Sequence, residues 1–348
     1  MITNSTYEEI IRQPLTWSET ISIVLEKQEE LKEKFDAVNP DEVIFIGCGT
    51  SYYISIAAAL NFQEQTGISA KAVPASEVFL KPDAILNKDK KTLIIGSSRS
   101  GNTSEIVNAF NYVKEHDLAT TIAITSYPEC DLARISDYTF ILPQVQEKSL
   151  VMTSTFTNIL LASQLIAGIV SKDENYLQEL KQLPERGADL LPQAEKLAKQ
   201  LGEDLSYDHY IFLGLGSYYG LACEGMLKMK EMTQANSEAF NPLEFRHGPI
   251  SVLSDKCRVV LLSNNSMKTY EEDLILDIKN FDANIIVLGE ENELAADYTY
   301  EVGIGLSDGT RGLLYLPFLQ LMAFYRTLQL GLHPDKPRNL NPVVILKQ

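Results

Sequence analysis

Short apolar runs alternate with amphipathic segments over most of the chain. The run at 42–46 leads into a turn rich in glycine and hydroxyl groups, and a helical pattern follows at 52–62. Further strand patterns, separated mostly by helical segments, lie at 70–73, 92–96, 120–124 and 138–142. Strands that alternate with helices predict a parallel sheet covered by helices, which is an α/β fold.

The second half of the chain repeats this pattern. Residues 211–219 match 44–53 with one residue dropped, and strand patterns follow at 258–262, 285–288 and 298–302. We therefore expect two tandem domains, each a doubly wound, mostly parallel sheet flanked by helices. The predicted parts are a helical lead-in at 1–40, a first domain at 41–172, a helical connection at 173–208 broken by Pro184 and Pro192, a second domain at 209–330 and a tail at 331–348.

Composition narrows the class of protein. A length of 348 residues suits two domains better than one core. The net charge of −17 argues against general nucleic-acid binding, which needs clustered Lys and Arg. No run approaches the ~18 apolar residues of a membrane span, and the N-terminus lacks a signal pattern, so we expect a cytoplasmic protein without a membrane partner. The cysteines form no C-x-x-C motif and indicate neither a disulfide framework nor a zinc site: Cys48, Cys130, Cys223 and Cys257.

The segment 98–103 lies between a predicted strand and a predicted helix. Backbone N–H groups at a helix N-terminus are unpaired and carry the positive end of the helix dipole. The hydroxyls of Ser98, Ser100 and Thr103 beside them would complete a site for an anion such as a phosphate monoester. The same residues are common in caps and turns, so this segment alone leaves both interpretations open.

Two other turns carry hydroxyl groups. Gly47 to Ser51, with Thr50 between the glycine-rich start and the helix, is a second candidate phosphate turn. It lacks the third glycine of the dinucleotide fingerprint, which argues against a nicotinamide-dependent dehydrogenase. The cluster at 152–157 opens an apolar helix, where Thr153 either faces the same site or caps the helix.

Candidate acid–base groups lie in the second half. Glu224, Lys228 and Glu231 are spaced by four and three residues, which places them on one face of a helix. An exposed salt-bridge ladder has the same spacing. His247 lies between Arg246 and a Gly-Pro pair in a rigid loop, where it is a poor core residue and a good acid–base candidate near neutral pH.

Six motifs together resemble the tandem sugar-isomerase (SIS) domain family. This family includes the isomerase half of glucosamine-6-phosphate synthase and the stand-alone amino-sugar 6-phosphate deaminases and fructosamine-6-phosphate deglycases. The motifs follow the order of the family over nearly the whole chain: G-C-G-T-S at 47–51, S-R-S-G-N-T at 98–103, M-T-S-T-F-T at 152–157, E-G-M-L-K-M-K-E at 224–231, E-F-R-H-G-P at 244–249 and D-K-P-R-N-L at 335–340.

The resemblance implies a role for each matching residue. Glu231 matches the carboxylate that moves a proton between C1 and C2 of the opened sugar, with Glu224 and Lys228 as neighbours on its helix. His247 matches the histidine that assists ring opening, which the family contributes across a homodimer interface. The family uses neither a metal nor an organic cofactor. The 6-phosphate and nearby hydroxyls are held at the positions of Thr50, Ser51, Ser98, Arg99, Ser100 and Thr103, and we add Thr153 as a substrate-binding candidate.

Two departures limit the resemblance. The synthase has a tail lysine that handles the sugar carbonyl, and here that position is Asn341, with Lys347 as the only later lysine. We also expect no N-terminal glutaminase domain like that of the synthase. We therefore expect an amino-sugar 6-phosphate deaminase/isomerase, with a fructosamine-6-phosphate deglycase or a plain aldose–ketose isomerase as alternatives. A non-catalytic phosphosugar sensor is a further alternative, although no DNA-reading segment accompanies it.

Overall fold

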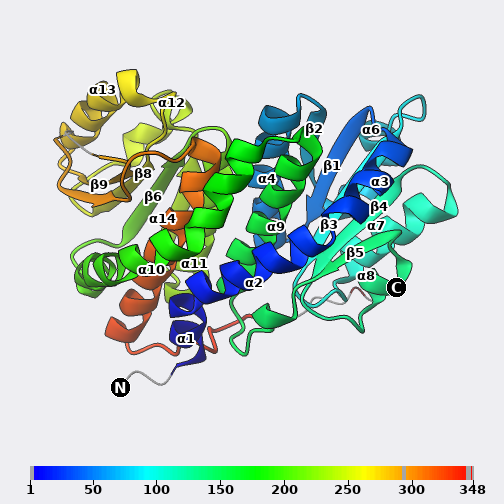
Figure 1. Cartoon of the computed structure of the whole chain (residues 1–348). Helices are drawn as coiled ribbons and strands as arrows, with labels where there is room; N and C mark the ends of the chain where they lie inside the picture. The colour runs from blue at the N-terminus through cyan, green and yellow to red at the C-terminus, as the bar shows by residue number, and fades with distance from the viewer. Residues whose placement is uncertain (1–3, 292–294, 342–345, 347–348) are drawn as a thin grey trace. The chain divides into compact units, whose positions relative to one another are not determined.

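The chain forms two compact units in this computed structural model, which describes residues 4–291, 295–341 and 346 (Figure 1). The N-terminal unit contains residues 12–148, 152–184 and the described residues from 341 on. The C-terminal unit contains residues 4–11, 149–151 and the described residues of 185–340. Each unit has its own five-stranded sheet, and together they confirm the predicted α/β fold with two tandem domains.

The sheet of the N-terminal unit is parallel throughout, with the strand order β2-β1-β3-β4-β5. All five strands had been predicted from apolar runs. The two adjacent central strands are buried along their whole length, as expected for a sheet covered on both faces. The strands are β1 (Glu42–Gly47), β2 (Ser69–Pro74), β3 (Thr92–Ser98), β4 (Thr120–Thr125) and β5 (Tyr138–Ile141).

Helices cover both faces of this sheet. Successive side chains of β1 point to opposite faces, so the strand contacts both layers of helices. Ile44 packs with Phe110 of α7 (Ser104–Glu115), in a cluster that also contains residues of α5 (Ala75–Leu80) and α8 (Asp131–Ile135). Phe45 instead contacts Phe62 of α4, with ring centroids 5.7 Å apart. The other helices of this unit are α2 (Gln13–Glu26), α3 (Gln28–Val38), α4 (Thr50–Thr66), α6 (Pro82–Ile85), η1 (Pro143–Val145) and α9 (Ser154–Ser171).

Helix α9 corrects one expectation. By length and composition it is apolar enough to cross a membrane, although we had expected no such run. Sixteen of its eighteen residues are buried inside the unit, where it packs against α2 and α4. Its polar groups are also paired there: Thr157 accepts a hydrogen bond from the Trp17 ring and Asn158 accepts one from Thr20. These contacts are those of a core helix in a folded domain.

The C-terminal unit repeats the topology, with the parallel order β7-β6-β8-β9-β10. Strand β7 was not predicted, because this edge strand is largely polar and only partly buried. Every other strand of this sheet had been predicted. The bounds are β6 (His209–Gly214), β7 (Asn236–Phe240), β8 (Cys257–Leu262), β9 (Asn284–Gly289) and β10 (Tyr298–Glu301).

Helices also cover both faces of the second sheet. Ile211 lies in a cluster with Phe245 of α12 (Pro242–Phe245) and Leu274 of α13 (Lys268–Lys279), beside η2 (Pro249–Val252). Phe212 points to the other face, toward Gly225 of α11. That helix packs against α14, the predicted apolar helix, and α14 also contacts α1. Their bounds are α1 (Ser5–Ile11), α11 (Ser217–Thr233) and α14 (Asp308–Gln329).

The predicted breaks at Pro184 and Pro192 are wrong. A single helix, α10 (Glu174–Glu203), continues through both prolines, and the division between the two units falls within it, after Pro184 (Figure 1). A proline inside a helix removes a hydrogen bond and costs about 3 kcal/mol. The apolar stripe of α10 offsets this cost, because Leu180, Leu183, Ala194 and Ala198 are fully buried.

The tail motif at 335–340 contacts the first residues of α1. The Asp335 carboxylate accepts hydrogen bonds from the backbone N–H groups of Ser5 and Thr6 and from the Thr6 hydroxyl, at 2.7–3.1 Å. It therefore caps α1 from a distant part of the sequence. Burial raises the pKa of Asp335, but the hydrogen bonds from Thr6 and Ser5 outweigh burial, so the pKa lies below its usual value.

Candidate functional site

The strand order brings two predicted phosphate turns together. In the N-terminal unit β1 lies beside β3, and the chain leaves these strands toward opposite edges of the sheet. Ligands of doubly wound sheets bind at the carboxyl ends of strands where the order reverses in this way. The turn after β1 and the turn after β3 are the two hydroxyl-rich segments that the sequence had singled out.

The turn between β3 and α7, residues 98–103, is called the anion turn below. Hydrogen bonds to its own hydroxyl groups hold its shape. Ser98 Oγ accepts a hydrogen bond from the Gly101 N–H at 3.1 Å and lies 3.2 Å from Thr103 Oγ1. Ser100 Oγ accepts one from the Asn102 N–H at 3.2 Å. Thr103, the N-cap residue, makes no side-chain cap to α7. The loop is thus shaped in advance, and the N-cap side chain does not cap the first turn of α7. The Ser104 hydroxyl in that turn accepts a hydrogen bond from the Leu346 N–H at 3.1 Å.

The turn between β1 and α4 is built on two glycines. A Cβ on Gly47 would collide with the backbone of Ser51, so glycine allows the helix to approach the strand closely. Gly49 has φ +54° and is the N-cap residue of α4, with no side chain over the helix end. Thr50 and Ser51, the first two residues of α4, are buried there. In both helices at this edge the N-cap residue itself provides no side-chain cap.

Replacement of Gly101 tests the shape of the anion turn. Gly101 has φ +65°, and an added Cβ would collide with the Cys130 sulfur. Gly67→Ala is a matched control in the same unit, because Gly67 has φ +71° with nothing within 4 Å of an added Cβ. The control should lose only the strain of a left-handed residue, about 1–2 kcal/mol. Gly101→Ala should lose a further 1–3 kcal/mol, roughly, from overpacking, as measured by urea unfolding.

Binding separates these two glycine variants further. Gly101→Ala should weaken glucose 6-phosphate in calorimetry, whereas Gly67→Ala should bind it like the parent protein. Equal stability and equal affinity of the two variants would contradict the role given to this turn.

Glu147, in the loop before α9, contacts the start of that helix and was not predicted from the sequence. Thr153 is fully buried, and both its N–H and its hydroxyl donate to Glu147, at 2.7 and 2.9 Å. Glu147 also lies 3.4 Å from a guanidinium nitrogen of Arg99. The signal in the sequence was weak, since Glu147 sits in an ordinary charged loop. Substrate binding by Thr153 stays a prediction.

The second predicted cluster lies on α11 in the C-terminal unit. Lys228 Nζ lies 2.7 Å from Glu231 Oε2 and 3.5 Å from Glu224 Oε1. Glu224 and Lys228 are fully buried, and the side chain of Glu231 is 19% exposed. An exposed salt-bridge ladder, which the spacing alone allowed, is therefore wrong. The arrangement holds one partly accessible carboxylate against a buried ammonium group.

His247 lies apart from this cluster in sequence and is exposed. It sits in the turn between α12 and η2, where Gly248 has φ +133°. The turn is fixed by the Asn241 side chain, which accepts hydrogen bonds from two backbone N–H groups of α12, and by an ion pair between Arg246 and Asp277 at 2.6 Å. The imidazole is thus presented to solvent on a rigid turn.

Comparison with known proteins identifies the family. Residues 38–168 and 206–304 match the SIS domain family, and the two matches together cover more than half of the chain. The chain belongs to the SIS domain family. Each matched segment contains the sheet of one unit, so both sheets are SIS folds.

The relatives that match this SIS chain are named for sugar phosphates. It is 28% identical over 98% of its length to a glutamine–fructose-6-phosphate aminotransferase (isomerizing) from Sulfurisphaera tokodaii, of which the match covers 56%. The chain thus spans about half the length of the curated relatives it matches.

Two solved structures resemble the chain over almost their whole length. A proposed tagatose-6-phosphate ketose/aldose isomerase from Clostridium novyi has a TM-score of 0.90 at 28% identity, covering 99% of this chain and 95% of that one. A glucosamine-6-phosphate deaminase from Thermotoga maritima has a TM-score of 0.74 at 27% identity, covering 94% and 99%. These relatives are enzymes by name, which supports an enzymatic role here.

The second SIS sheet keeps the first turn of the first sheet but not its anion turn. Gly216 has φ +61° and ψ −131°, close to the +54° and −125° of Gly49. After β8, however, the N–H of Asn265 donates to the Asp308 carboxylate, which also pairs with the buried Arg311. The loop of the second sheet therefore already holds a carboxylate of the chain itself.

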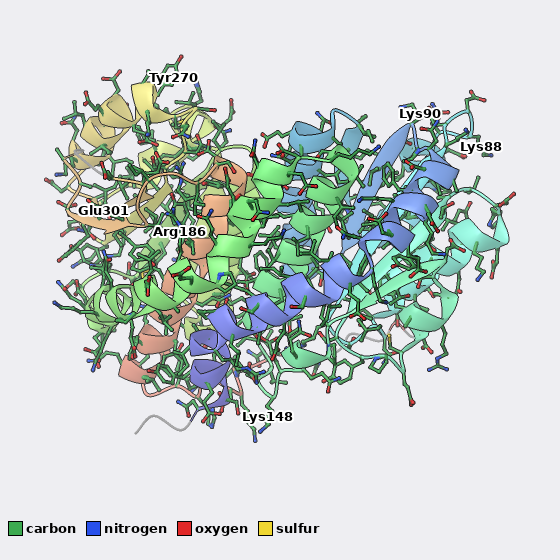
Figure 2. The ribbon with its side chains drawn as sticks, viewed as in Figure 1. Lys88, Lys90, Lys148, Arg186, Tyr270 and Glu301 are labelled. Carbon is green, nitrogen blue, oxygen red and sulfur yellow. The ribbon has the colours of Figure 1, made fainter. Side chains whose placement is uncertain are left out.

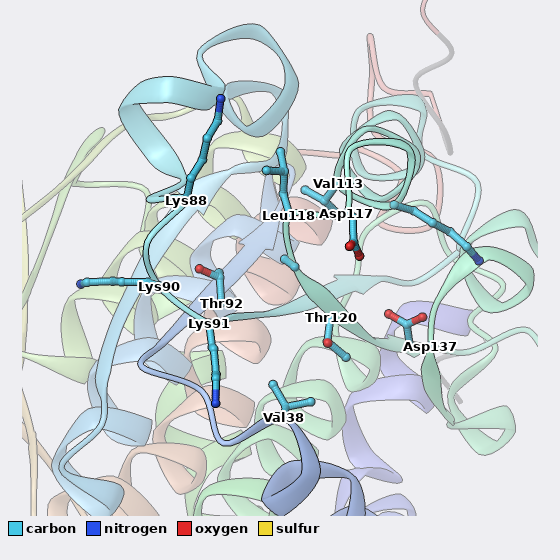
Figure 3. A pocket seen from close by; sticks show the side chains of 12 residues that line it. Val38, Lys88, Lys90, Lys91, Thr92, Val113, Asp117, Leu118, Thr120 and Asp137 are labelled. Carbon is cyan, nitrogen blue, oxygen red and sulfur yellow. The ribbon is translucent and has the colours of Figure 1, made fainter.

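A large cavity of the N-terminal SIS unit lies away from these turns. It measures about 600 Å³, and Figure 3 shows lysines of the loop before β3 on one side and Asp117 and Asp137 on the other. Lys88 and Lys90 of this loop project outward (Figure 2). Thr92 and Thr120, the first residues of β3 and β4, line the cavity. Because the strands are parallel, it lies at the end of the sheet opposite the anion turn.

Side chains suited to metal or thiol chemistry are sparse. Within 4–291, 295–341 and 346, no three His, Cys, Asp or Glu side chains group to hold a metal ion. All four cysteines are free thiols. Burial, and then the charge of Glu105, raise the pKa of Cys48 to about 12, so its thiol stays protonated near neutral pH.

The tail motif reaches the end of α11. Met232, next to Glu231, lines a cavity of about 230 Å³ together with His333, Lys336 and Arg338. The motif that carries part of the SIS resemblance thus lies beside the helix that carries the acid–base candidate. Lys347 lies outside the described residues, and Asn341 is the last described residue before that gap.

Proposed function

We propose that this SIS chain is an amino-sugar 6-phosphate deaminase/isomerase, which moves a proton between C1 and C2 of a hexosamine or fructosamine 6-phosphate. The observation that carries the proposal is the set on α11, in which a buried ammonium group fixes a partly exposed carboxylate at 2.7 Å. A general base needs this combination of fixed orientation and access. The second support is the anion turn after β3, at the edge of the sheet where ligands of this fold bind.

The phosphate group is the handle of the proposed substrate. Backbone N–H groups at the start of α7, the hydroxyls of Ser98, Ser100 and Thr103 and the cation of Arg99 would bind the dianion. Thr50 and Ser51 would bind it or neighbouring hydroxyls from the turn after β1. Binding energy from this non-reacting group orients the reacting carbons, which raises the rate as well as the affinity.

Glu231 would carry the proton. In the open-chain amino sugar its carboxylate removes the proton from C2, which gives an enolamine, and then, after exchange of its proton with solvent, donates a proton to C1. The imine left at C2 reacts with water, so that ammonia leaves and a ketose 6-phosphate remains. Lys228, between the two glutamates, offsets their negative charge and holds the carboxylate of Glu231 in position.

The relatives support a phosphosugar substrate and divide on the reaction. The Thermotoga maritima structure is named a deaminase and the Clostridium novyi structure a ketose/aldose isomerase. A plain isomerase would use the same anion turn and the same carboxylate without releasing ammonia, and a deglycase would release an amine. A soluble cytoplasmic enzyme is consistent with such substrates, because hexose phosphates are retained inside cells by their charge.

A coupled assay tests the reaction. Free ammonia and ketose 6-phosphate are measured together over a panel of hexosamine 6-phosphates, fructosamine 6-phosphates and plain hexose 6-phosphates. The proposal predicts equimolar ammonia and ketose phosphate from a hexosamine 6-phosphate. Interconversion of plain hexose phosphates without ammonia would replace it with the isomerase alternative. Binding without turnover on the whole panel would replace it with the sensor alternative.

We further propose that the protein acts as a homodimer in which His247 opens the sugar ring in the site of the partner subunit. Its exposure on a rigid turn supports this. Glu231→Gln and His247→Asn should each be inactive alone. Unfolded together and refolded as a mixture, they should regain about a quarter of the sites, since half of the dimers then carry one intact site. No recovery on mixing would assign His247 to its own subunit or to no site.

A further inference from the structure

Glu147 contacts two parts of the N-terminal SIS unit with one carboxylate, the start of α9 and the anion turn. Its side chain is only 1% exposed. Oε1 accepts hydrogen bonds from the N–H groups of Thr153 and Thr155, at 2.7 and 3.2 Å, and from the hydroxyls of Thr153 and Ser154. These bonds cap the first turn of α9 from outside the helix, in place of the N-cap residue Thr153, whose own side chain caps nothing.

The second oxygen of Glu147 faces the anion turn. Oε2 lies 2.7 Å from Thr155 Oγ1, whose single hydroxyl proton is shared with the Val145 carbonyl at 2.8 Å, and 3.4 Å from a guanidinium nitrogen of Arg99. Arg99 is the residue between Ser98 and Ser100 in that turn, and its side chain is 13% exposed. The two oxygens therefore link the rigid start of a core helix to the one cation among the residues 98–103.

We propose that Glu147 is a positioning residue for phosphate binding, which acts through Arg99. An arginine side chain has several rotatable bonds, and holding it in one orientation beforehand removes part of the entropic cost of binding. Glu147 provides this hold because donors of α9 fix the carboxylate itself. The proposal rests on the proposed phosphosugar function, and it adds a residue that lies outside every motif of the SIS resemblance.

The sign of the effect distinguishes positioning from simple charge. A negative charge near a phosphate site repels the ligand, so removal of Glu147 would by charge alone tighten binding. Loss of the guanidinium orientation weakens binding instead. A contact to a charged group contributes about tenfold or more to affinity. We therefore expect positioning to outweigh repulsion.

Glu147→Gln is the sharpest variant. Glutamine retains an acceptor oxygen for the bonds made by Oε1, and its NH₂ group can donate to Thr155 Oγ1, whose hydroxyl then donates to the Val145 carbonyl. The NH₂ group has no acceptor for the Arg99 guanidinium, so only that contact is lost. The dissociation constants of glucose 6-phosphate and inorganic phosphate, measured by calorimetry, should each rise about tenfold. In the Arg99→Met background the same substitution should change neither constant by more than about twofold, because the group it acts through is gone.

Glu42→Gln is the matched control. Glu42 is a buried carboxylate of the same unit, paired with Lys71 and Lys90 and hydrogen-bonded to Thr92, but it lies at the start of β1, away from the anion turn. This variant should bind both ligands as the parent protein does. If Glu147→Gln does not fold, Thr155→Val replaces it, because valine lacks the hydroxyl that contacts Oε2. This variant should raise the dissociation constants of both ligands about threefold.

The outcomes separate this inference from the proposed function. Unchanged or tighter binding in a folded Glu147→Gln protein overturns the inference, as does an equal loss in the Arg99→Met background, which would indicate a structural role only. A parent protein that binds glucose 6-phosphate but turns over no amino-sugar phosphate overturns the function alone. A parent protein that binds neither ligand overturns both.

Discussion

Glu231→Gln should lower kcat on a hexosamine 6-phosphate by about 10²–10⁴, the usual effect of removing a general base. The amide keeps the size and most hydrogen-bonding capacity of the side chain but cannot take up a proton. The side chain at 231 is then neutral, so its 2.7 Å contact with Lys228 is no longer an ion pair. Lys228 itself remains buried beside Glu224. The anion turn lies on another part of the chain. The dissociation constant of glucose 6-phosphate should therefore stay near the value for the parent protein.

Two measurements make this result specific to proton transfer. In deuterated water the parent enzyme should incorporate deuterium at the carbon that Glu231 reprotonates, and Glu231→Gln should not. Glu238→Gln is the control, because Glu238 is exposed on β7 and pairs with His209 at 3.0 Å. Near-normal turnover of Glu231→Gln on every substrate of the parent enzyme would remove Glu231 from the mechanism.

Lys228→Met should destabilise the protein by about 3–5 kcal/mol, the cost of breaking a buried ion pair by removing one partner. Lys228 and Glu224 are both fully buried, and methionine fills a similar volume without a charge. The uncompensated carboxylate of Glu224 then carries the cost. The double variant Glu224→Gln/Lys228→Met removes both charges and should recover much of the lost stability.

A lysine on the same helix provides the control for this prediction. Lys230 is exposed on α11, so Lys230→Met should change the free energy of unfolding by less than about 0.5 kcal/mol. Urea unfolding at constant pH measures all three variants. If Lys228→Met were as stable as Lys230→Met, the ion pair would have no structural weight. In that case the proposed role of Lys228 in holding Glu231 would lack its basis.

The strands that could be predicted are those whose apolar runs face helices on both sides. β1 and β3 are buried along their length and stand out in the sequence. β7 was not predicted from the sequence. An edge strand is paired on one side only and tolerates polar residues, here Asn236 and Glu238. For α10 the error was the reverse, because the sequence predicted breaks that do not exist. Proline disfavours a helix locally, but burial of the apolar stripe of α10 outweighs that effect.

The residues of the candidate site likewise include some that the sequence could predict and one that it could not. Helical spacing placed Glu224, Lys228 and Glu231 on one face, but spacing carries no information on burial, so an exposed ladder remained open until the structure showed two of them buried. Glu147 could not be found in this way. Its partners lie six to eight residues later and, in Arg99, 48 residues earlier, and only the fold brings these groups together.

A crystal structure of the protein with glucose 6-phosphate tests the central claim, that the turn after β3 is the phosphate site. The account predicts phosphate oxygens within about 2.7–3.2 Å of donors among residues 98–104, with Arg99 still against Glu147. A phosphate group held elsewhere, for example in the lysine-lined cavity before β3, with the turn empty, would contradict it.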